Sequence, residues 1–308
     1  MKMNWWEPLC LCFGCLVGLS CAPRVAMPQV PESAEFKSYW LSGTAEVTSY
    51  DLTQARYGNL NHGQMVLIMV SEPFRTDKQV KSELHPGLND TTIMKAQTVR
   101  KFITGIYDYT MTTTSFKPLG IDDKALKINA TSTEWCGQTF QQFNLKSGAY
   151  DVQSRSYFES EADENFTIGD AISEDEIWQR VRMAPDLLPR GPIKLIPSLV
   201  SSRLRHRKPA IETVTAELTE YSGKAAKAKD LRTYRLTYAA GSKEERTVEF
   251  VFERKFPHRI VEFNEEYLDG FSNPRRLRTT AVYKRQLKLD YWRTHDPEHV
   301  GLRKELGL

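Results

Sequence analysis

The sequence predicts a mainly β protein. We expect a large curved antiparallel sheet, forming a half-barrel or a sandwich of two sheets, with one or two short helices. Apolar side chains recur at every second position through much of the 308-residue chain, the period of a strand with one buried face. Glycine and proline separate these runs at short intervals. About a dozen such runs predict a sheet large enough to curl.

The first 20 residues have the features of an export signal. Lys2 supplies a positive charge, and residues 8–19 are apolar apart from small residues, a length that suits a signal peptide better than a membrane span. Cys21 follows Gly-Leu-Ser, so we expect it to be acylated as in bacterial lipoproteins. Cys15 is a second possible processing point, and a plain secretory signal is the alternative. Acyl chains on Cys21 would hold the protein at a membrane.

Residues 21–38 contain three prolines and little apolar periodicity, which predicts an extended tether. Residues 39–308 then form a β-rich envelope domain. Its possible halves, 39–172 and 190–295, are divided by a helix.

In the first half, six runs have the pattern of strands: 39–48, 64–70, 93–102, 106–116, 126–131 and 150–158. The second of these is almost continuously apolar, which favours a central strand. The acidic run 159–164 is expected to end this part of the sheet.

One helix is predicted between the halves. Ser173, with Glu176 three residues later, matches a capping box, in which each side chain bonds a free backbone N–H at the helix start. Ile177 and Val181 fall on one face, and Pro185 would end the helix. We expect this helix to plug or flank the sheet.

The second half repeats the strand pattern more regularly. Residues 198–208 fit a strand or a short helix. Five runs then follow, at 213–218, 233–238, 248–253, 260–263 and 276–289, and short loops separate them. Consecutive strands joined this way predict an antiparallel meander. The polar tail from Asp296 is expected to form a short helix.

Composition restricts the class of partner. The net charge is +3, with 40% hydrophobic and 26% charged residues. Because proteins that bind nucleic acid usually carry a concentrated basic surface, we expect no nucleic-acid partner. No motif in the sequence calls for a cofactor.

Cys136 is the one cysteine outside the N-terminal segment. Trp135-Cys136-Gly137 begins like a thioredoxin-type motif, but Thr139 stands where the second cysteine would be, which excludes C-x-x-C exchange chemistry. No histidine lies nearby in the sequence to act as a base. We therefore interpret Cys136 as a buried structural thiol rather than a nucleophile.

Three polar clusters have a functional and an ordinary interpretation. His295 and His299, one helical turn apart, could bind a metal, and the acidic run 159–164 could bind calcium. Pro297 separates the histidines, and the acidic run lacks EF-hand spacing, so we predict solvated surface and no metal site. The arginines at 203, 205 and 207 and at 275, 276 and 278 could meet anionic headgroups, or could be ordinary basic surface.

An aromatic set supplies the candidate ligand-lining residues. These residues lie on neighbouring predicted elements and could line a concavity of the sheet that holds an apolar or amphipathic ligand. They are Tyr107, Tyr109, Trp135, Tyr150, Phe158 and Trp178. Packing in the core is the alternative interpretation.

Several segments resemble a known family. Residues 134–137 (Glu-Trp-Cys-Gly), 157–161 (Tyr-Phe-Glu-Ser-Glu), 174–178 (Glu-Asp-Glu-Ile-Trp) and 39–43 (Tyr-Trp-Leu-Ser-Gly) are similar to uncharacterised lipoproteins exported by Gram-negative bacteria. Members often carry the automatic name "septum formation inhibitor Maf". The C-terminal meander looks similar to half-barrel domains related to lipoprotein carriers.

The resemblance and the residues lead to one functional expectation and one alternative. We expect a non-catalytic lipoprotein, anchored through its lipidated N-terminus at the periplasmic face or the outer membrane, which binds an amphipathic ligand or another envelope protein. The alternative is an envelope hydrolase, such as the nucleotide pyrophosphatase that the Maf name implies. True Maf proteins carry a Ser-Pro-Arg-Arg-type motif, and the nearest match here is Ala22-Pro23-Arg24 in the tether.

Overall fold

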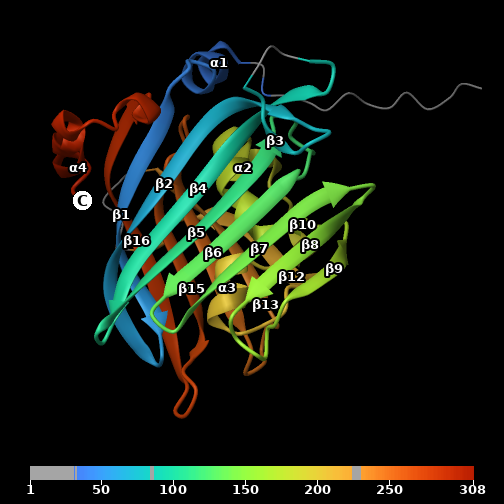
Figure 1. Ribbon diagram of the computed structural model, residues 1–308, viewed down its shortest axis with the longest axis vertical. Helices are drawn as coiled ribbons and strands as arrows, with labels where there is room; N and C mark the ends of the chain where they lie inside the picture. Colours follow the sequence, from blue (N-terminus) through green and yellow to red (C-terminus); the bar gives the residue numbers. More distant parts are fainter. Residues whose placement is uncertain (1–30, 32, 84–86, 224–229) are drawn as a thin grey trace, which may run out of the picture.

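The computed structural model describes residues 31, 33–83, 87–223 and 230–308, and it forms one curved sheet around a helical interior (Figure 1). The signal peptide, Cys21 and most of the predicted tether lie outside the described residues. None of the helices in the described part of the chain has the length and apolarity needed to cross a bilayer.

The first nine strands of the described chain lie before Asp170. They are β1 (Ala45–Arg56), β2 (Asn59–Arg75), β3 (Val80–Lys81), β4 (Asp90–Thr104), β5 (Tyr107–Pro118), β6 (Lys127–Glu134), β7 (Gly137–Lys146), β8 (Ala149–Ser156) and β9 (Glu164–Gly169). The remaining strands are β10 (Ile172–Ser173), β11 (Gly191–Ile196), β12 (Glu212–Glu220), β13 (Leu231–Tyr238), β14 (Arg246–Glu253), β15 (Ile260–Asp269) and β16 (Arg275–Leu289).

The helical elements are short. They are α1 (Ala34–Trp40), η1 (Glu174–Glu176), α2 (Ile177–Met183), η2 (Pro185–Leu187), α3 (Leu199–Leu204), η3 (Tyr291–Arg293), η4 (Pro297–Val300) and α4 (Gly301–Glu305). We call residues 290–308, which include the last three of these elements, the C-terminal lobe.

All 16 strands belong to one sheet. Its order is β10-β11-β12-β13-β14-β15-β16-β1-β2-β4-β5-β6-β7-β8-β9, with β3 beside β2. Within the described chain, the short β10–β11 pair is parallel and the other pairs are antiparallel. The prediction of a mainly β fold with a large antiparallel sheet is confirmed, and the strands form one curved sheet rather than two packed sheets. The predicted meander is confirmed as β12–β16.

Alternation along the strands separates the two faces of the sheet. On β2, Met65, Leu67 and Met69 are fully buried against the interior, while Val66 and Ile68 between them point outward and are half-buried. The same parity on the other central strands encloses one large apolar cluster around α2. Both predicted halves contribute to this cluster, so they share one core.

The two ends of the sheet also approach each other. Ile168 of β9, Ile196 of β11 and Leu199 of α3 belong to a second buried cluster. The sheet order places β9 and β11 near opposite ends of the sheet. Side-chain packing therefore closes the curve where no backbone ladder joins the two ends.

The folded domain begins earlier than the sequence predicts. Residues 34–38, expected to be extended tether, and Tyr39, expected to open a strand, form α1 instead. Ser33 caps this helix by accepting a hydrogen bond from the Phe36 amide, at 3.0 Å. Phe36 and Trp40 are four residues apart and both buried, so they lie on one helical face. The spacing of Phe36 and Trp40 was the signal in the sequence for helix α1.

The predicted central helix is confirmed as η1 and α2, ending before Pro185. The prediction of a capping box is right for Ser173 and wrong for Glu176. Ser173 accepts from the Asp175 amide, but Glu176 turns away from the cap and accepts from the Ala125 amide at 2.7 Å. Glu176 also pairs with Arg180. Every residue of α2 is buried. Through the Ala125 amide, Glu176 connects this buried helix to the chain just before β6 and does not cap the helix's own first turn.

One further prediction needs correction. The acidic run 159–164 does not end the sheet, because β9 begins at Glu164. Of the two alternatives for residues 198–208, the short helix is the one observed, as α3, so the arginines at 203, 205 and 207 do not alternate along a strand.

Buried ion pairs connect the interior helices to the sheet. Arg246 of β14 is 0% exposed and bonds both oxygens of Glu174 in η1, at 2.6 and 2.7 Å, and Glu265 of β15 at 2.6 Å. Burial alone would raise the pKa of Glu265, but the charges of Arg246 and Arg100 outweigh burial and lower it. These charges are stable in the interior only as a group, because each compensates the desolvation of another.

Candidate functional site

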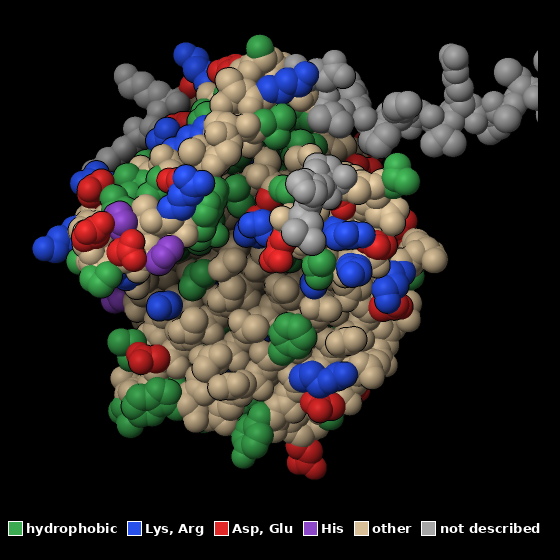
Figure 2. Space-filling view, turned by 45° about the horizontal axis from the view of Figure 1, so that its top comes forward, with side chains coloured by type: hydrophobic (Ala, Val, Ile, Leu, Met, Phe, Trp, Pro, Cys, Tyr) green, Lys and Arg blue, Asp and Glu red, His purple; other side chains and the backbone are tan. Residues whose placement is uncertain are grey.

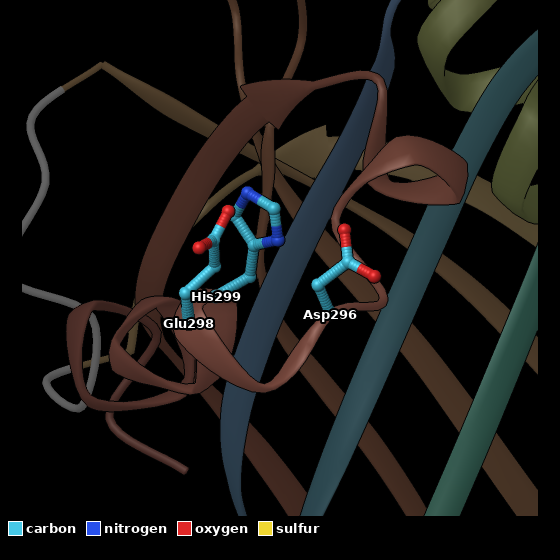
Figure 3. Close-up of side chains that lie close together, drawn as sticks. All are labelled: Asp296, Glu298 and His299. Atoms are coloured by element: carbon cyan, nitrogen blue, oxygen red, sulfur yellow. The ribbon is translucent and has the colours of Figure 1, made fainter.

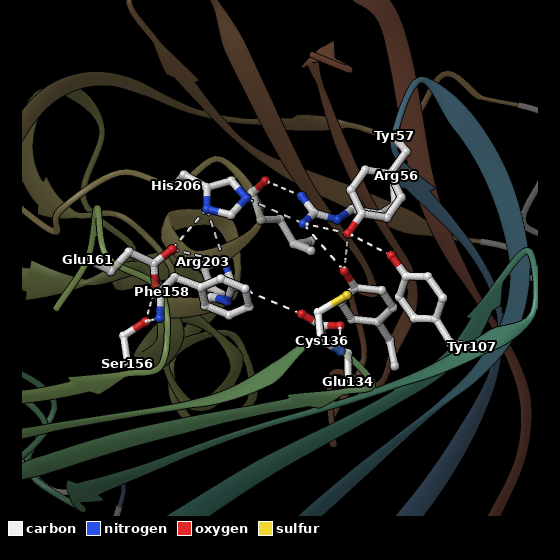
Figure 4. Close-up of polar contacts among 12 residues, drawn as sticks. Arg56, Tyr57, Tyr107, Glu134, Cys136, Ser156, Phe158, Glu161, Arg203 and His206 are labelled. Atoms are coloured by element: carbon white, nitrogen blue, oxygen red, sulfur yellow. Dashed lines mark hydrogen bonds and ion pairs between the residues drawn. The ribbon is translucent and has the colours of Figure 1, made fainter. Parts of the chain in front are cut away.

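At one end of the sheet, turns and loops surround an opening to the inner face, which we call the mouth (Figure 4). The turns joining β1 to β2, β4 to β5 and β6 to β7, the β8–β9 loop and the end of α3 meet there. The side chains of the mouth come from segments far apart in the sequence. Figure 4 labels Arg56, Tyr57, Tyr107, Glu134, Cys136, Ser156, Phe158, Glu161, Arg203 and His206, and the Tyr109 hydroxyl joins them through its contacts with Tyr57 and Arg56.

Three phenols and one guanidinium form the first part of the mouth. The hydroxyls of Tyr57 and Tyr109 are 2.6 Å apart, and Tyr107 donates to the Tyr57 hydroxyl at 3.1 Å. Arg56 is buried and lies 3.4 Å from the hydroxyls of Tyr57 and Tyr109, while it donates to the Leu204 carbonyl at 2.6 Å. Two donors, Tyr107 and Arg56, therefore converge on the Tyr57 oxygen, which also shares a hydrogen bond with the Tyr109 hydroxyl.

This arrangement shifts the pKa values of the three phenols in different directions. Burial acts to raise the pKa of Tyr57, but hydrogen bonds from Tyr107 and Tyr109 and the charge of Arg56 outweigh it, and the pKa is lowered. The hydrogen bond to Tyr57 and burial raise the pKa of Tyr107 to about 12. Burial is the main cause that raises the pKa of Tyr109. Tyr57 is thus the most acidic phenol of the three.

Two residues of the mouth adopt the left-handed backbone conformation. Tyr57 has φ +57° and precedes Gly58 at φ +72° in the two-residue turn between β1 and β2. Such turns favour asparagine or aspartate before the glycine. His206, just beyond α3, has φ +52°. Non-glycine residues in this region cost about 1–3 kcal/mol each. Six other non-glycine residues of the described chain share the conformation, so backbone strain alone does not distinguish the mouth.

A carboxylate, a histidine and an arginine form the second part of the mouth. Oε1 of Glu161 lies 2.9 Å from Nδ1 of His206 and accepts from Arg203 at 2.9 Å. Arg203 also lies 3.7 Å from Glu134 and stacks over the Phe158 ring at 4.3 Å. Burial acts to raise the pKa of Glu161, but the hydrogen bond with His206 and the charge of Arg203 lower it.

A small open recess of about 80 Å³ lies on the inner face beside these residues. Its walls combine hydroxyl and amide groups from β7, β8 and the loops with four basic and two acidic side chains and one aromatic ring. The lining residues are Thr139, Gln141, Ser154, Ser160, Glu161, Glu164, Phe166, Ser202, Arg203, His206, Arg207, Lys208 and Pro209. Nε of Arg203 is buried there without a hydrogen-bond partner in the described chain.

Exposed apolar side chains surround the mouth, and we call them the rim. Ile106 is 80% exposed, Trp135 65%, Tyr157 79% and Phe271 70%. Each lies on a different turn, and apolar side chains project singly from the lower end of the molecule in Figure 2. The Phe271 ring lies 5.8 Å from Tyr57, and Trp135 lies 6.2 Å from Tyr107, so the rim is continuous with the phenols.

Cys136 is exposed, and its thiol is free. The interpretation of a buried structural thiol was therefore wrong. Trp135 and Cys136 form the two-residue turn between β6 and β7, and residues in such a turn point away from the core. The Cys136 amide is held by Glu134, at 2.7 Å.

The structure brings four of the six aromatic candidates together at the mouth: Tyr107, Tyr109, Trp135 and Phe158. The other two lie in the core. Tyr150 is fully buried and donates to the Ala125 carbonyl at 2.8 Å, and Trp178 packs edge-on against Phe250 at 5.0 Å.

Sequence reasoning missed four members of the mouth: Arg56, Tyr57, Ser156 and His206. Tyr57-Gly58 between two apolar runs was a usable hairpin signal. Nothing local to the sequence indicated that His206 lies 3.4 Å from Arg56.

The C-terminal lobe carries one cluster of possible metal ligands. Single ligand atoms of Asp296, Glu298 and His299 lie within 4.8 Å of one another (Figure 3). His295 is not part of this group. Asp296 and Glu298 are exposed, and no further ligand from the described chain joins them, so we assign this cluster no metal.

Comparisons with protein-family models, with curated proteins and with solved structures found no match to this chain.

Proposed function

We propose that this protein is a non-catalytic binding protein of the bacterial cell envelope, anchored by acyl chains on Cys21, and that its mouth holds the anionic head of an amphipathic ligand. One observation carries the proposal. A recess with basic and hydroxyl groups opens on the inner face of the sheet and adjoins a rim of exposed aromatic and aliphatic side chains.

The recess suits an anionic head that accepts several hydrogen bonds. Arg203, His206, Arg207 and Lys208 line it, and Ser154 and Thr139 add hydroxyl donors. Arginine binds phosphate and carboxylate groups through paired N–H donors. Glu161 already engages Arg203 and His206, so it fixes their positions before a ligand arrives and lowers the entropy cost of binding.

The rim suits the apolar part of the same ligand. Trp135, Tyr157 and Phe271 offer large, rigid apolar surfaces next to water, which single-domain proteins usually keep for contacts with a ligand, partner or membrane. A purely apolar ligand fits less well, because the centre of the sheet's concavity is filled by the core around α2.

The catalytic alternative is favoured by one observation, the lowered pKa of Tyr57, which would suit a general base in an envelope hydrolase. Both ring nitrogens of His206 are engaged, with Glu161 and with Arg56. The histidine is thereby held in place, which favours binding over proton transfer. Release of pyrophosphate from nucleoside triphosphates by purified protein, lost in Tyr57→Phe, would establish the hydrolase instead.

The binding proposal is tested with dodecyl phosphate as the probe and dodecanol as the head-less comparison, by titration calorimetry below the micelle concentration. We expect dodecyl phosphate to bind more tightly than dodecanol, and Lys208→Gln and Arg203→Gln to remove that difference. Lys243→Gln, an exposed lysine outside the recess, is the matched control. Equal affinity for the two probes in the wild-type protein would refute an anion-binding mouth, and circular dichroism would verify that each variant folds.

Membrane anchoring is tested separately. Cys21→Ser is expected to release the protein from the membrane fraction of cells, and unchanged fractionation would contradict lipidation at this residue.

A further inference from the structure

A second hollow lies on the outer face of the sheet, beneath the C-terminal lobe, and we call it the groove. Its volume is about 320 Å³. Ser49 of β1 donates to the Leu306 carbonyl at 2.5 Å, which holds the lobe against the sheet. In Figure 2, apolar side chains gather on the face beside this lobe. The groove is separate from the mouth, since the two share no lining residue.

Aliphatic side chains form the floor and the roof of the groove. The floor consists of outward-facing residues of four adjacent strands: Val47, Val66, Val99, Leu287 and Leu289. The roof consists of Leu302, Leu306 and Leu308 from the lobe. Outward positions on a sheet that faces water are usually polar, so a band of aliphatic residues across four strands is a departure that the lobe covers only in part.

The charged residues that line the groove are all basic. They are Lys101, His299 and Arg303, and no aspartate or glutamate side chain lines it. Neither Lys101 nor Arg303 forms an ion pair within the described chain. Nδ1 of His299 is a buried atom without a hydrogen-bond partner among the described residues. Asp296 and Glu298 lie near His299 but are exposed, so they do not line the groove.

We infer that the groove is a binding site for a long-chain fatty acid. The alkyl chain lies along the aliphatic floor under the lobe, and the carboxylate meets Lys101, Arg303 and His299. An unbranched chain matches an apolar floor that crosses several strands, and one anionic head matches two cations without ion-pair partners in the described chain, Lys101 and Arg303, beside the His299 ring. This site does not depend on the proposed function of the mouth.

Affinity is expected to depend on the length of the chain. Burying one methylene group strengthens binding by about fourfold, so dodecanoate should bind much more tightly than octanoate. The double variant Lys101→Gln/Arg303→Gln is expected to weaken dodecanoate binding by about tenfold and to leave dodecanol binding unchanged. Lys243→Gln/Arg254→Gln, two exposed cations elsewhere on the molecule, is the matched control.

A substitution in the floor distinguishes the contribution of the ligand's alkyl chain to binding from that of its carboxylate. Val66→Gln is expected to weaken dodecanoate and dodecanol equally, because it makes the floor polar without touching the cations. Ile103→Gln, four residues from Val99 along the same face of β4 and outside the groove lining, should change neither. Val66 is half-buried and Ile103 exposed, and both point away from the core, so both variants should fold.

Location is settled by photolabelling the full chain with a diazirine fatty acid and mapping the labelled peptides by mass spectrometry. Label in residues 64–66, 99–101 or 287–308 is the expected result. Label confined to residues 139–166 and 202–209 would overturn the inference and assign the fatty acid to the mouth. Absence of label, or affinity that does not rise with chain length, would overturn it as well.

Discussion

Replacing Arg246 by methionine tests whether the buried ion pairs hold the helical interior in place. Arg246 is fully buried and makes three short hydrogen bonds, two to Glu174 and one to Glu265. Methionine fills similar space but leaves two carboxylates without their main cation. Breaking a buried ion pair costs about 3–5 kcal/mol. Since a whole domain is stable by about 5–15 kcal/mol, we expect Arg246→Met to remove about a fifth or more of the free energy of unfolding.

The assay is urea unfolding followed by circular dichroism, with Arg254→Met as the matched control. Arg254 also pairs with two acidic residues, but its side chain is 42% exposed, so its replacement should leave the unfolding midpoint unchanged. Adding Glu174→Gln and Glu265→Gln to Arg246→Met should restore part of the loss, because the orphaned charges are then removed. A loss below about 1 kcal/mol, the size seen for surface pairs, would refute the reasoning.

Three further predictions concern single groups. Burial raises the pKa of Asp175 to about 6. Between the ordinary pKa of an aspartate and about pH 6, the folded protein therefore binds a proton on Asp175 that the unfolded chain does not. This residue makes the protein more stable as the pH falls through that range. Asp175→Asn should remove this contribution, and parallel pH profiles of unfolding for the two proteins would contradict it. Tyr57→Phe should abolish the earliest phenolate absorbance to appear in an alkaline titration, and an unchanged first step would assign it to another tyrosine. Cys136 should react with Ellman's reagent in the native protein as fast as in urea; protection in the native state would contradict its exposure.

Local patterns in the sequence were sufficient for the sheet but not for the interior. Period-two alternation predicts strands because the side chains of each strand alternate between a buried and an exposed face whatever its neighbours are. Met65, Leu67 and Met69 form the buried face of β2 in this way. The capping box at Ser173 failed for the opposite reason. Glu176 is fully buried, and a buried carboxylate takes the strongest partners available, here Arg180 and the Ala125 amide, which sequence spacing alone does not reveal.

The candidate site depends on contacts between distant segments. Arg56 ends β1, and it meets His206 and the Leu204 carbonyl about 150 residues later. The aromatic residues Tyr107, Trp135 and Phe158 were identified from composition and order alone. Their convergence with Arg56 follows from the curvature of the sheet, which no single segment specifies. Trp178 and Tyr150 lie in the core for different reasons: helix α2 is buried along its whole length, and Tyr150 lies near the start of β8, at the other end of that strand from Ser156 and the mouth.

The pairing of β1 with β16 has a consequence for how the protein acquires its structure. Thr53 lies opposite Thr280, so the ladder in the middle of the sheet joins strands from the two ends of the described chain. Until the last strand arrives, β1 and β15 each present an unpaired edge, which invites aggregation. Contacts of such sequence separation form slowly. A chain emerging gradually from a ribosome or a translocation channel therefore has to keep its first strands unaggregated until nearly the whole polypeptide has been delivered, which would make chaperone protection most valuable for this protein before its final hairpin docks.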